Sequence, residues 1–214
     1  GAITFTPTNG ASSETITNLL LASGLGQGAD INIGATNTLS VLGVITVYGH
    51  GGANTATSIP TGRLDMGNAS RTFTINDTAA ATELDLGATL TGNTTAAALA
   101  KTGPGTLEMS GSQVNSYAGT TNVNEGALLL NRNLGATTGA LILSTLTVGD
   151  NVGGPKDDIV RYGATATGNQ IAGQVGVAVN STGWLDLNNR SDAFGATPLL
   201  PNAATTAPGL ALVI

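Results

Sequence analysis

A short strand pattern recurs along the middle of the chain at a nearly constant interval. In each copy two apolar residues flank a third residue, and a small turn-forming residue follows. Four copies begin at Leu64, Leu84, Leu107 and Leu128. Self-similarity at an interval of roughly 20–23 residues is typical of solenoids, in which each repeat forms one coil.

The physics of one copy explains why the copies must stack. Side chains alternate between the two faces of a strand, so Leu84 and Leu86 point to one side and Asp85 to the other. One strand cannot bury its own leucines, but strands stacked at about 4.8 Å pair their backbones and place leucine on leucine. The pattern continues less regularly at Leu146–Val148, Val177–Val179 and Leu185–Leu187. The predicted core residues of the repeat are Leu64, Met66, Leu84, Leu86, Leu107, Met109, Leu128, Leu130, Leu146, Val148, Leu185 and Leu187.

Composition favours strands over other structures. The chain of 214 residues is 41% hydrophobic but only 9% charged, whereas disordered chains combine low hydrophobicity with high charge. Its Thr, Asn, Ser and 31 Gly residues suit strands and the bends between them and are poor helix formers. Second strands are expected at residues 71–76 and 121–124. We therefore predict an all-β fold, a parallel β-helix (β-solenoid) of about ten coils, each with two or three strands and about 20–23 residues.

The charge balance excludes several function classes. A net charge of −6 with seven scattered basic residues argues against nucleic acid, which needs clustered Lys and Arg. No run of eighteen apolar residues is present, so we expect no transmembrane helix. We expect no cofactor. A leucine-rich horseshoe has a similar period, but its units need a helical return, and here the returns contain Gly, Thr and Asn.

Residues 101–131 contain a recognisable motif. Lys101-Thr-Gly-Pro-Gly-Thr-Leu-Glu-Met-Ser-Gly111 is followed by Asn115-Ser-Tyr-Ala-Gly-Thr-Thr-Asn-Val-Asn-Glu-Gly-Ala-Leu-Leu-Leu-Asn131. This stretch resembles the autotransporter-associated β-strand repeat, also called the passenger-associated repeat, whose pattern is K-x-G-x-G-T-L-x-L-S-G and then N-x-Y-x-G-x-T-x-V-x-x-G-x-L-x-L. The motif residues carried by this chain are Gly103, Gly105, Gly111, Tyr117, Gly119 and Gly126.

The resemblance implies a right-handed β-helix, export, and an extracellular or cell-surface location on a double-membraned bacterium. Residues 61–214 are predicted to form coils that continue beyond the C-terminus, because the apolar stretch from Pro208 to Ile214 lacks a polar cap. Residues 1–60 contain strands that do not fall into register with the repeat. They are either early coils with longer loops or a distinct terminal element.

Acidic residues supply two candidate sites. Asp150, Asp157 and Asp158 form the densest group of oxygen ligands, which is a weak candidate for calcium and more simply a polar turn between coils. Asp65, Asp85 and Glu108 occupy matching positions of the strand pattern and are expected to form an acidic row. Such a row is more simply a solvated decoration than a cation-bridging or catalytic arrangement, and we expect no catalytic residue.

The aromatic residues and the histidine offer few further candidate sites. Tyr117, Tyr162 and Trp184 could provide a stacking platform for a surface glycan, although core packing is the simpler interpretation. His50 is the only histidine, so no site needing two histidines can form. The sequence therefore predicts a structural or adhesive, non-enzymatic solenoid. Its expected partner is itself, in a fibre or filament, or further coils of a larger repeat protein. The alternatives are a polysaccharide-degrading β-helix enzyme and a carbohydrate-binding module.

Overall fold

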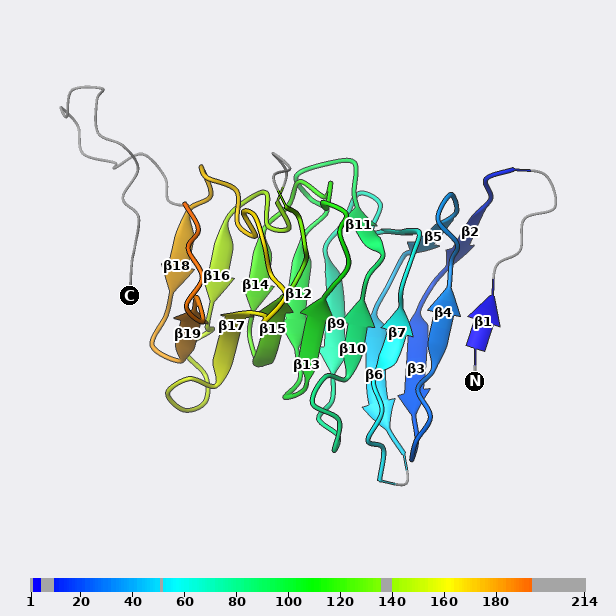
Figure 1. The fold of residues 1–214 in the computed structure, drawn as a ribbon, viewed down its shortest axis with the longest axis horizontal. Helices are drawn as coiled ribbons and strands as arrows, with labels where there is room; N and C mark the ends of the chain where they lie inside the picture. Colours follow the sequence, from blue (N-terminus) through cyan, green and yellow to red (C-terminus); the bar gives the residue numbers. More distant parts are fainter. Residues whose placement is uncertain (1, 5–9, 51, 136–139, 194–214) are drawn as a thin grey trace.

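Parallel β-sheets extend along the whole length of the molecule in the computed structural model of the chain (Figure 1). The structure describes residues 2–4, 10–50, 52–135 and 140–193. Each strand pairs with strands from the preceding and following circuits of the chain, so the backbone winds as a β-solenoid of about seven turns. The predicted all-β solenoid class is confirmed. No helix occurs in these residues, and hence none that is long and apolar enough to cross a membrane.

The early circuits each contribute one strand to each of three sheets, here called A, B and C. Sheet A contains β1 (Ala2–Thr4), β4 (Asp30–Asn32), β7 (Thr57–Ile59), β10 (Leu84–Leu86), β13 (Thr106–Met109), β15 (Gly126–Leu130), β17 (Asp158–Tyr162) and β19 (Gly183–Asp186). Sheet B contains β2 (Ser13–Ile16), β5 (Thr38–Val41), β8 (Arg63–Asp65) and β11 (Thr89–Thr91). Sheet C contains β3 (Leu19–Ser23), β6 (Ile45–Gly49), β9 (Arg71–Ile75), β12 (Leu99–Thr102), β14 (Thr121–Val123), β16 (Leu146–Val148) and β18 (Val177–Val179).

The coils vary in length more than the sequence interval suggests. On sheet A, Leu84 pairs with Leu107 and Leu107 pairs with Leu128, so these two coils have the predicted length. The coil before them, from Ser58 to Asp85, is several residues longer. The coil after them, from Leu128 to Val160, is the longest of the four. The predicted length therefore holds only for the two coils around the motif, and about seven turns account for the described chain instead of about ten coils.

Alternating burial along the strands defines the core. In β9 the pattern is buried, intermediate, buried, intermediate, buried, so that Phe73 and Ile75 point inward. The same alternation in the other sheets fills the interior with one continuous cluster of apolar side chains. At a strand spacing of about 4.8 Å, seven turns form a rod roughly 34 Å long. Burial of this cluster is the main force that holds the rod together.

Strands near the N-terminus lie in the same three sheets as the later ones. β1 pairs with β4, β2 pairs with β5 and β3 pairs with β6. Ile3 lies in β1 of sheet A and Val47 lies in β6 of sheet C. The predicted uncapped end at Pro208–Ile214 lies outside the described residues.

Sheet B stops after four strands, and buried side chains replace its ladder in the following coils. The backbone N–H of Leu90 in β11 donates to Oδ1 of Asn115 at 3.0 Å, and Nδ2 of Asn115 donates to the carbonyl of Leu141 at 3.1 Å. The N–H of Leu141 donates in turn to the carbonyl of Gln170. The N–H of Gln170 then donates to Oδ2 of Asp192 at 2.8 Å. We call this continuation of sheet B the polar column.

Candidate functional site

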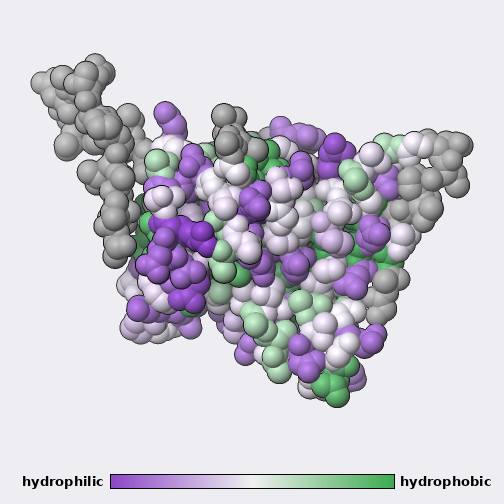
Figure 2. All heavy atoms as spheres, in the orientation of Figure 1, coloured by the Kyte–Doolittle hydropathy of each residue, from purple (hydrophilic) through white to green (hydrophobic). Residues whose placement is uncertain are grey.

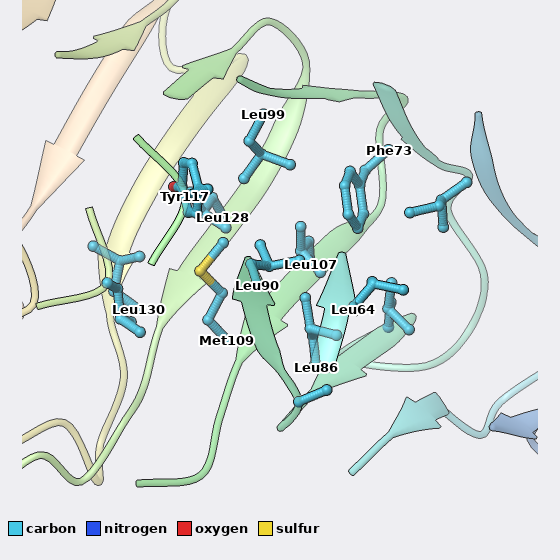
Figure 3. Close-up of a cluster of buried hydrophobic side chains, with 14 of the residues drawn as sticks. Leu64, Phe73, Leu86, Leu90, Leu99, Leu107, Met109, Tyr117, Leu128 and Leu130 are labelled. Atoms are coloured by element: carbon cyan, nitrogen blue, oxygen red, sulfur yellow. The ribbon is translucent and has the colours of Figure 1, made fainter. Parts of the chain in front are cut away.

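The predicted core residues are buried except Leu185, which is partly buried against the core, and they do not share one sheet. Leu84, Leu107 and Leu128 form one inward row of sheet A, and each is fully buried. Figure 3 shows several of these side chains converging on the interior. Leu86, Met109 and Leu130 form the parallel row, which continues to Tyr162.

Leu64 does not continue the row of Leu84, contrary to what the regular spacing predicts. Leu64 lies in β8 of sheet B between Leu39 and Leu90, whereas the residue beside Leu84 is Thr57. The interval between Leu64 and Leu84 is short because it covers less than one circuit, from β8 in sheet B through β9 in sheet C to β10 in sheet A. Leu146 and Val148 belong to sheet C, and Leu185 returns to sheet A beside Val160.

The motif glycines allow the backbones of successive coils to approach closely. A Cβ on Gly119 would lie 2.4 Å from the carbonyl oxygen of Ala97, and one on Gly105 would lie 2.8 Å from that of Asn76. Gly126 combines a φ of +69° with a Cβ position 2.6 Å from the oxygen of Gly103. A side chain at these positions would therefore separate the coils or strain the backbone.

Tyr117 is a core residue and not a surface platform. Its ring is fully buried, and its hydroxyl lies 2.6 Å from that of Thr121. Burial raises the pKa of Tyr117 to about 12. Tyr162 is also buried and donates to Asp192 at 2.6 Å. Neither ring can stack on a glycan, which removes two of the three residues proposed for that role.

Lys101 is fully buried at the corner between sheets C and A. Its Nζ donates to the carbonyls of Gly103 at 2.6 Å, Glu125 at 2.9 Å and Thr102 at 3.2 Å. Desolvation lowers the pKa of this ammonium to about 8, while the negative charge of Glu125 opposes the shift. The lysine of the motif therefore joins two consecutive corners by hydrogen bonds to backbone oxygens that strands leave unpaired.

Carboxylates complete the same corner. Glu125 accepts from the N–H of Gly103 at 2.9 Å, and buried Glu83 accepts from the N–H of Thr106 at 2.6 Å. Each of these bonds joins adjacent coils where the chain turns between sheets. The side chains of this corner therefore hold backbone amides and carbonyls in place, which is a structural role.

The motif residues and their coil geometry agree with a comparison against protein families. The family model described as passenger-associated-transport-repeat matches residues 99–130. The chain carries a passenger-associated-transport-repeat. This repeat comprises β12, β13, β14 and β15, together with the Lys101 corner and the buried ring of Tyr117. No curated protein and no solved structure matched the chain.

The weak calcium candidate lies one turn after the repeat. Asp150 and Asp157 are exposed in the loop before β17, whereas Asp158 begins that strand and is fully buried. Burial raises the pKa of Asp158, and the charges of Asp150 and Asp157 add to this shift. Across residues 2–4, 10–50, 52–135 and 140–193, no three His, Asp or Glu side chains are placed to hold a metal ion.

The expected acidic row is present only in part. Asp85 and Glu108 are neighbours on the outer face of sheet A, but Asp65 lies in sheet B, where Ser40 and Thr91 donate to it. Ser58 takes the place beside Asp85. Burial raises the pKa of Asp85, the bond from Ser110 opposes the shift, and the charge of Glu108 adds to it.

Trp184 on β19 is engaged by two cations. Nζ of Lys156 lies 4.2 Å from the centroid of its ring, and the guanidinium of Arg161 lies 5.2 Å away. Arg161 also pairs with Asp186 at 2.7 Å. The Lys156 contact joins the loop before β17 to β19, and the Arg161 contact joins β17 to the same strand.

Sequence reasoning missed the buried polar residues Arg132, Asn115, Gln170 and Asp192. Arg132 has no exposed surface and donates to the carbonyls of Ala88, Leu86 and Gln113. Asn115 could have been found, since it is the first residue of the second half of the motif. The other three follow no interval that the sequence repeats.

Proposed function

We propose that this chain is a rigid spacer in the exported part of a bacterial surface protein. The passenger-associated repeat and the solenoid fold fit an extracellular protein of the autotransporter-passenger kind. The observation that carries the spacer role is the continuous core. Side chains fill the interior from Leu19 in the first coil to Leu187 in the last, so the coils form one body.

The mechanism of a spacer is mechanical. Hydrogen bonds between coils run along the axis of the rod, and the Lys101 corner and the polar column add side-chain bonds in the same direction. A load along the axis is therefore shared among several bonds per coil, and displacing one coil would expose the apolar faces of its neighbours. The face in Figure 2 is mostly hydrophilic or neutral, and its hydrophobic residues lie in small separate areas. Large exposed apolar patches mark binding surfaces, and a spacer does not need one on this face.

Surface labelling tests the location. Antibodies raised against the isolated chain are expected to label intact cells of the bacterium that produces it, and protease added outside the cells should remove the signal. Labelling that needs permeabilised cells would contradict the proposal. Replacement of the chain by a flexible Gly/Ser linker of about ten residues, whose fully extended length is close to that of the rod, tests the spacer role, because the average end-to-end distance of such a linker is only about 17 Å. The segment displayed beyond the chain should then lie closer to the cell surface.

A further inference from the structure

A groove of about 440 Å³ lies at the corner where the chain turns from sheet A into sheet B. We call it the corner groove. Its lining comes from four successive turns, each of which follows a strand of sheet A and contributes in order Ala35, Thr61, Gly87 and Ser112. At about 4.8 Å per coil, four turns extend over roughly 14 Å along the rod. The corner groove is therefore long enough for several units of an extended chain.

Hydrogen-bonding side chains that the fold does not use line the corner groove. The hydroxyls of Thr89 and Ser112 and the side-chain amide of Gln113 make no hydrogen bond within the described part of the chain. Ser112 and Gln113 are exposed. No aromatic, Leu, Ile, Val or Met side chain is among the described lining residues. The lining thus suits a ligand with many hydroxyl groups better than an apolar one.

Two guanidinium groups make the corner groove positive although the chain as a whole is acidic. Arg63 lines it, and its single hydrogen bond, from Nη1 to the carbonyl of Thr36, is long at 3.4 Å. Arg132 lies beneath it, fully buried, and donates to the carbonyls of Ala88 and Gln113. Burial lowers the pKa of Arg132 to about 10, so this group stays charged at neutral pH. Neither guanidinium forms an ion pair with a described residue.

The neighbouring carboxylates lie outside the corner groove, since no Asp or Glu is among its described lining residues. Asp85, whose charge acts on Arg132, lies on the outer face of sheet A and accepts from Ser110. Asp65 in β8 accepts from Ser40 and Thr91. These carboxylates are therefore held by hydroxyl groups of the protein and leave the positive charge of the corner groove available to an anion.

We propose that the corner groove binds a linear polysaccharide that carries carboxylate groups. Arg63 holds a carboxylate through two parallel hydrogen bonds, and Thr89, Ser112 and Gln113 bind the sugar hydroxyls. An acidic peptide fits less well, because β8 and β10 each have a neighbouring strand on both sides and offer no free edge for a further strand. This site is an addition to the spacer role and does not depend on it.

Calorimetric titration of the whole chain with short oligosaccharides of polygalacturonate and of alginate tests the proposal. Both are linear chains of uronic acids. At least one is expected to bind, and binding should weaken as the salt concentration rises. Methyl-esterified polygalacturonate has the same backbone without the charge and should bind roughly 10-fold or more weakly. Polyglutamate presents its carboxylates on a peptide and should also bind more weakly.

Single substitutions locate the site. Arg63→Ala removes the guanidinium that lines the corner groove and should weaken binding of the uronic acid chain by roughly 10-fold or more. Ser112→Trp narrows the corner groove without changing its charge and should also weaken binding. Lys156→Ala is the matched control, because it removes one positive charge from an exposed position in the loop before β17. This control should bind as the unaltered chain does.

The proposal is overturned if neither uronic acid chain binds, or if the esterified chain or polyglutamate binds as tightly. It is also overturned if Arg63→Ala or Ser112→Trp binds as tightly as the unaltered chain, or if Lys156→Ala weakens binding as much as Arg63→Ala. Surface labelling and linker replacement do not depend on these titrations, so failure of this site and failure of the spacer role are distinguishable.

Discussion

The guanidinium of Arg132 donates a hydrogen bond of 2.5 Å to the carbonyl of Ala88, which lies 44 residues earlier and two coils away. The same group donates to the carbonyl of Gln113 in the coil between them. Both carbonyls lie near the place where sheet B ends and backbone partners are no longer available. A buried arginine thus supplies donors that a fifth strand of sheet B would have provided.

Removing the guanidinium should destabilise the rod strongly. Arg132→Met keeps much of the side-chain volume but leaves buried carbonyls without donors, and each unsatisfied group costs about 1–3 kcal/mol. We expect the free energy of unfolding in urea to fall by about 3–5 kcal/mol. Arg63→Ala removes an exposed arginine that makes only one long bond, of 3.4 Å to Thr36, and should change stability by less than about 0.5 kcal/mol. Equal losses in the two variants would contradict a role for the buried charge.

The amide of Asn115 should be irreplaceable by a carboxylate of the same shape. Asn115→Asp keeps the acceptor for the N–H of Leu90 but loses the donor to the carbonyl of Leu141. We expect a loss of about 2–4 kcal/mol near neutral pH. Acidification should recover part of this loss, because a protonated carboxyl can donate. Asn122→Asp, on the outer face of sheet C, is the matched control and should show neither effect.

The sequence predicts the parts of this fold that depend on local chemistry. Alternating leucines and turn glycines are visible in any one coil, so the solenoid class and the inward positions of Leu107 and Leu128 could be predicted. The pairing of Leu64 could not, because its pattern is the same as that of Leu84 although the two residues lie in different sheets. A regular interval therefore identifies the strand type but does not assign strands to sheets.

Long-range polar contacts could not be predicted from the sequence for a different reason. Arg132 and Asp192 are isolated charges in the sequence, and in most proteins such residues are exposed. Their burial follows from the absence of a strand at one corner in the later coils, which is a property of the whole coil and not of the residue.

Close approach of the coils makes the motif glycines sensitive to a single methyl group. Gly126→Ala would place Cβ 2.6 Å from the oxygen of Gly103 at a φ of +69°, and we expect a loss of about 2–4 kcal/mol in the free energy of unfolding. Gly176→Ala is the matched control, since its Cβ would meet no atom within 4 Å. Its effect should lie within about 0.5 kcal/mol of zero. Thermal and urea unfolding of both variants measure the difference, and a tolerant Gly126 would mean that the corner can widen.

Titration of Lys101 should make the rod more stable in mildly alkaline solution. Its pKa is lowered from 10.5 to about 8 by burial, so between these values the unfolded chain binds more protons than the folded one. The free energy of unfolding should therefore rise with pH from about 8 to 10, by up to about 1.4 kcal/mol per pH unit. Above pH 10 the trend should weaken, because burial raises the pKa of Tyr117 to about 12 and holds it protonated while the unfolded tyrosine ionises. Urea unfolding at several pH values measures the slope. In the Lys101→Arg variant the side chain stays charged throughout this pH range, so the rise in the free energy of unfolding with pH should disappear. A rise that persists in this variant would assign the effect to another group.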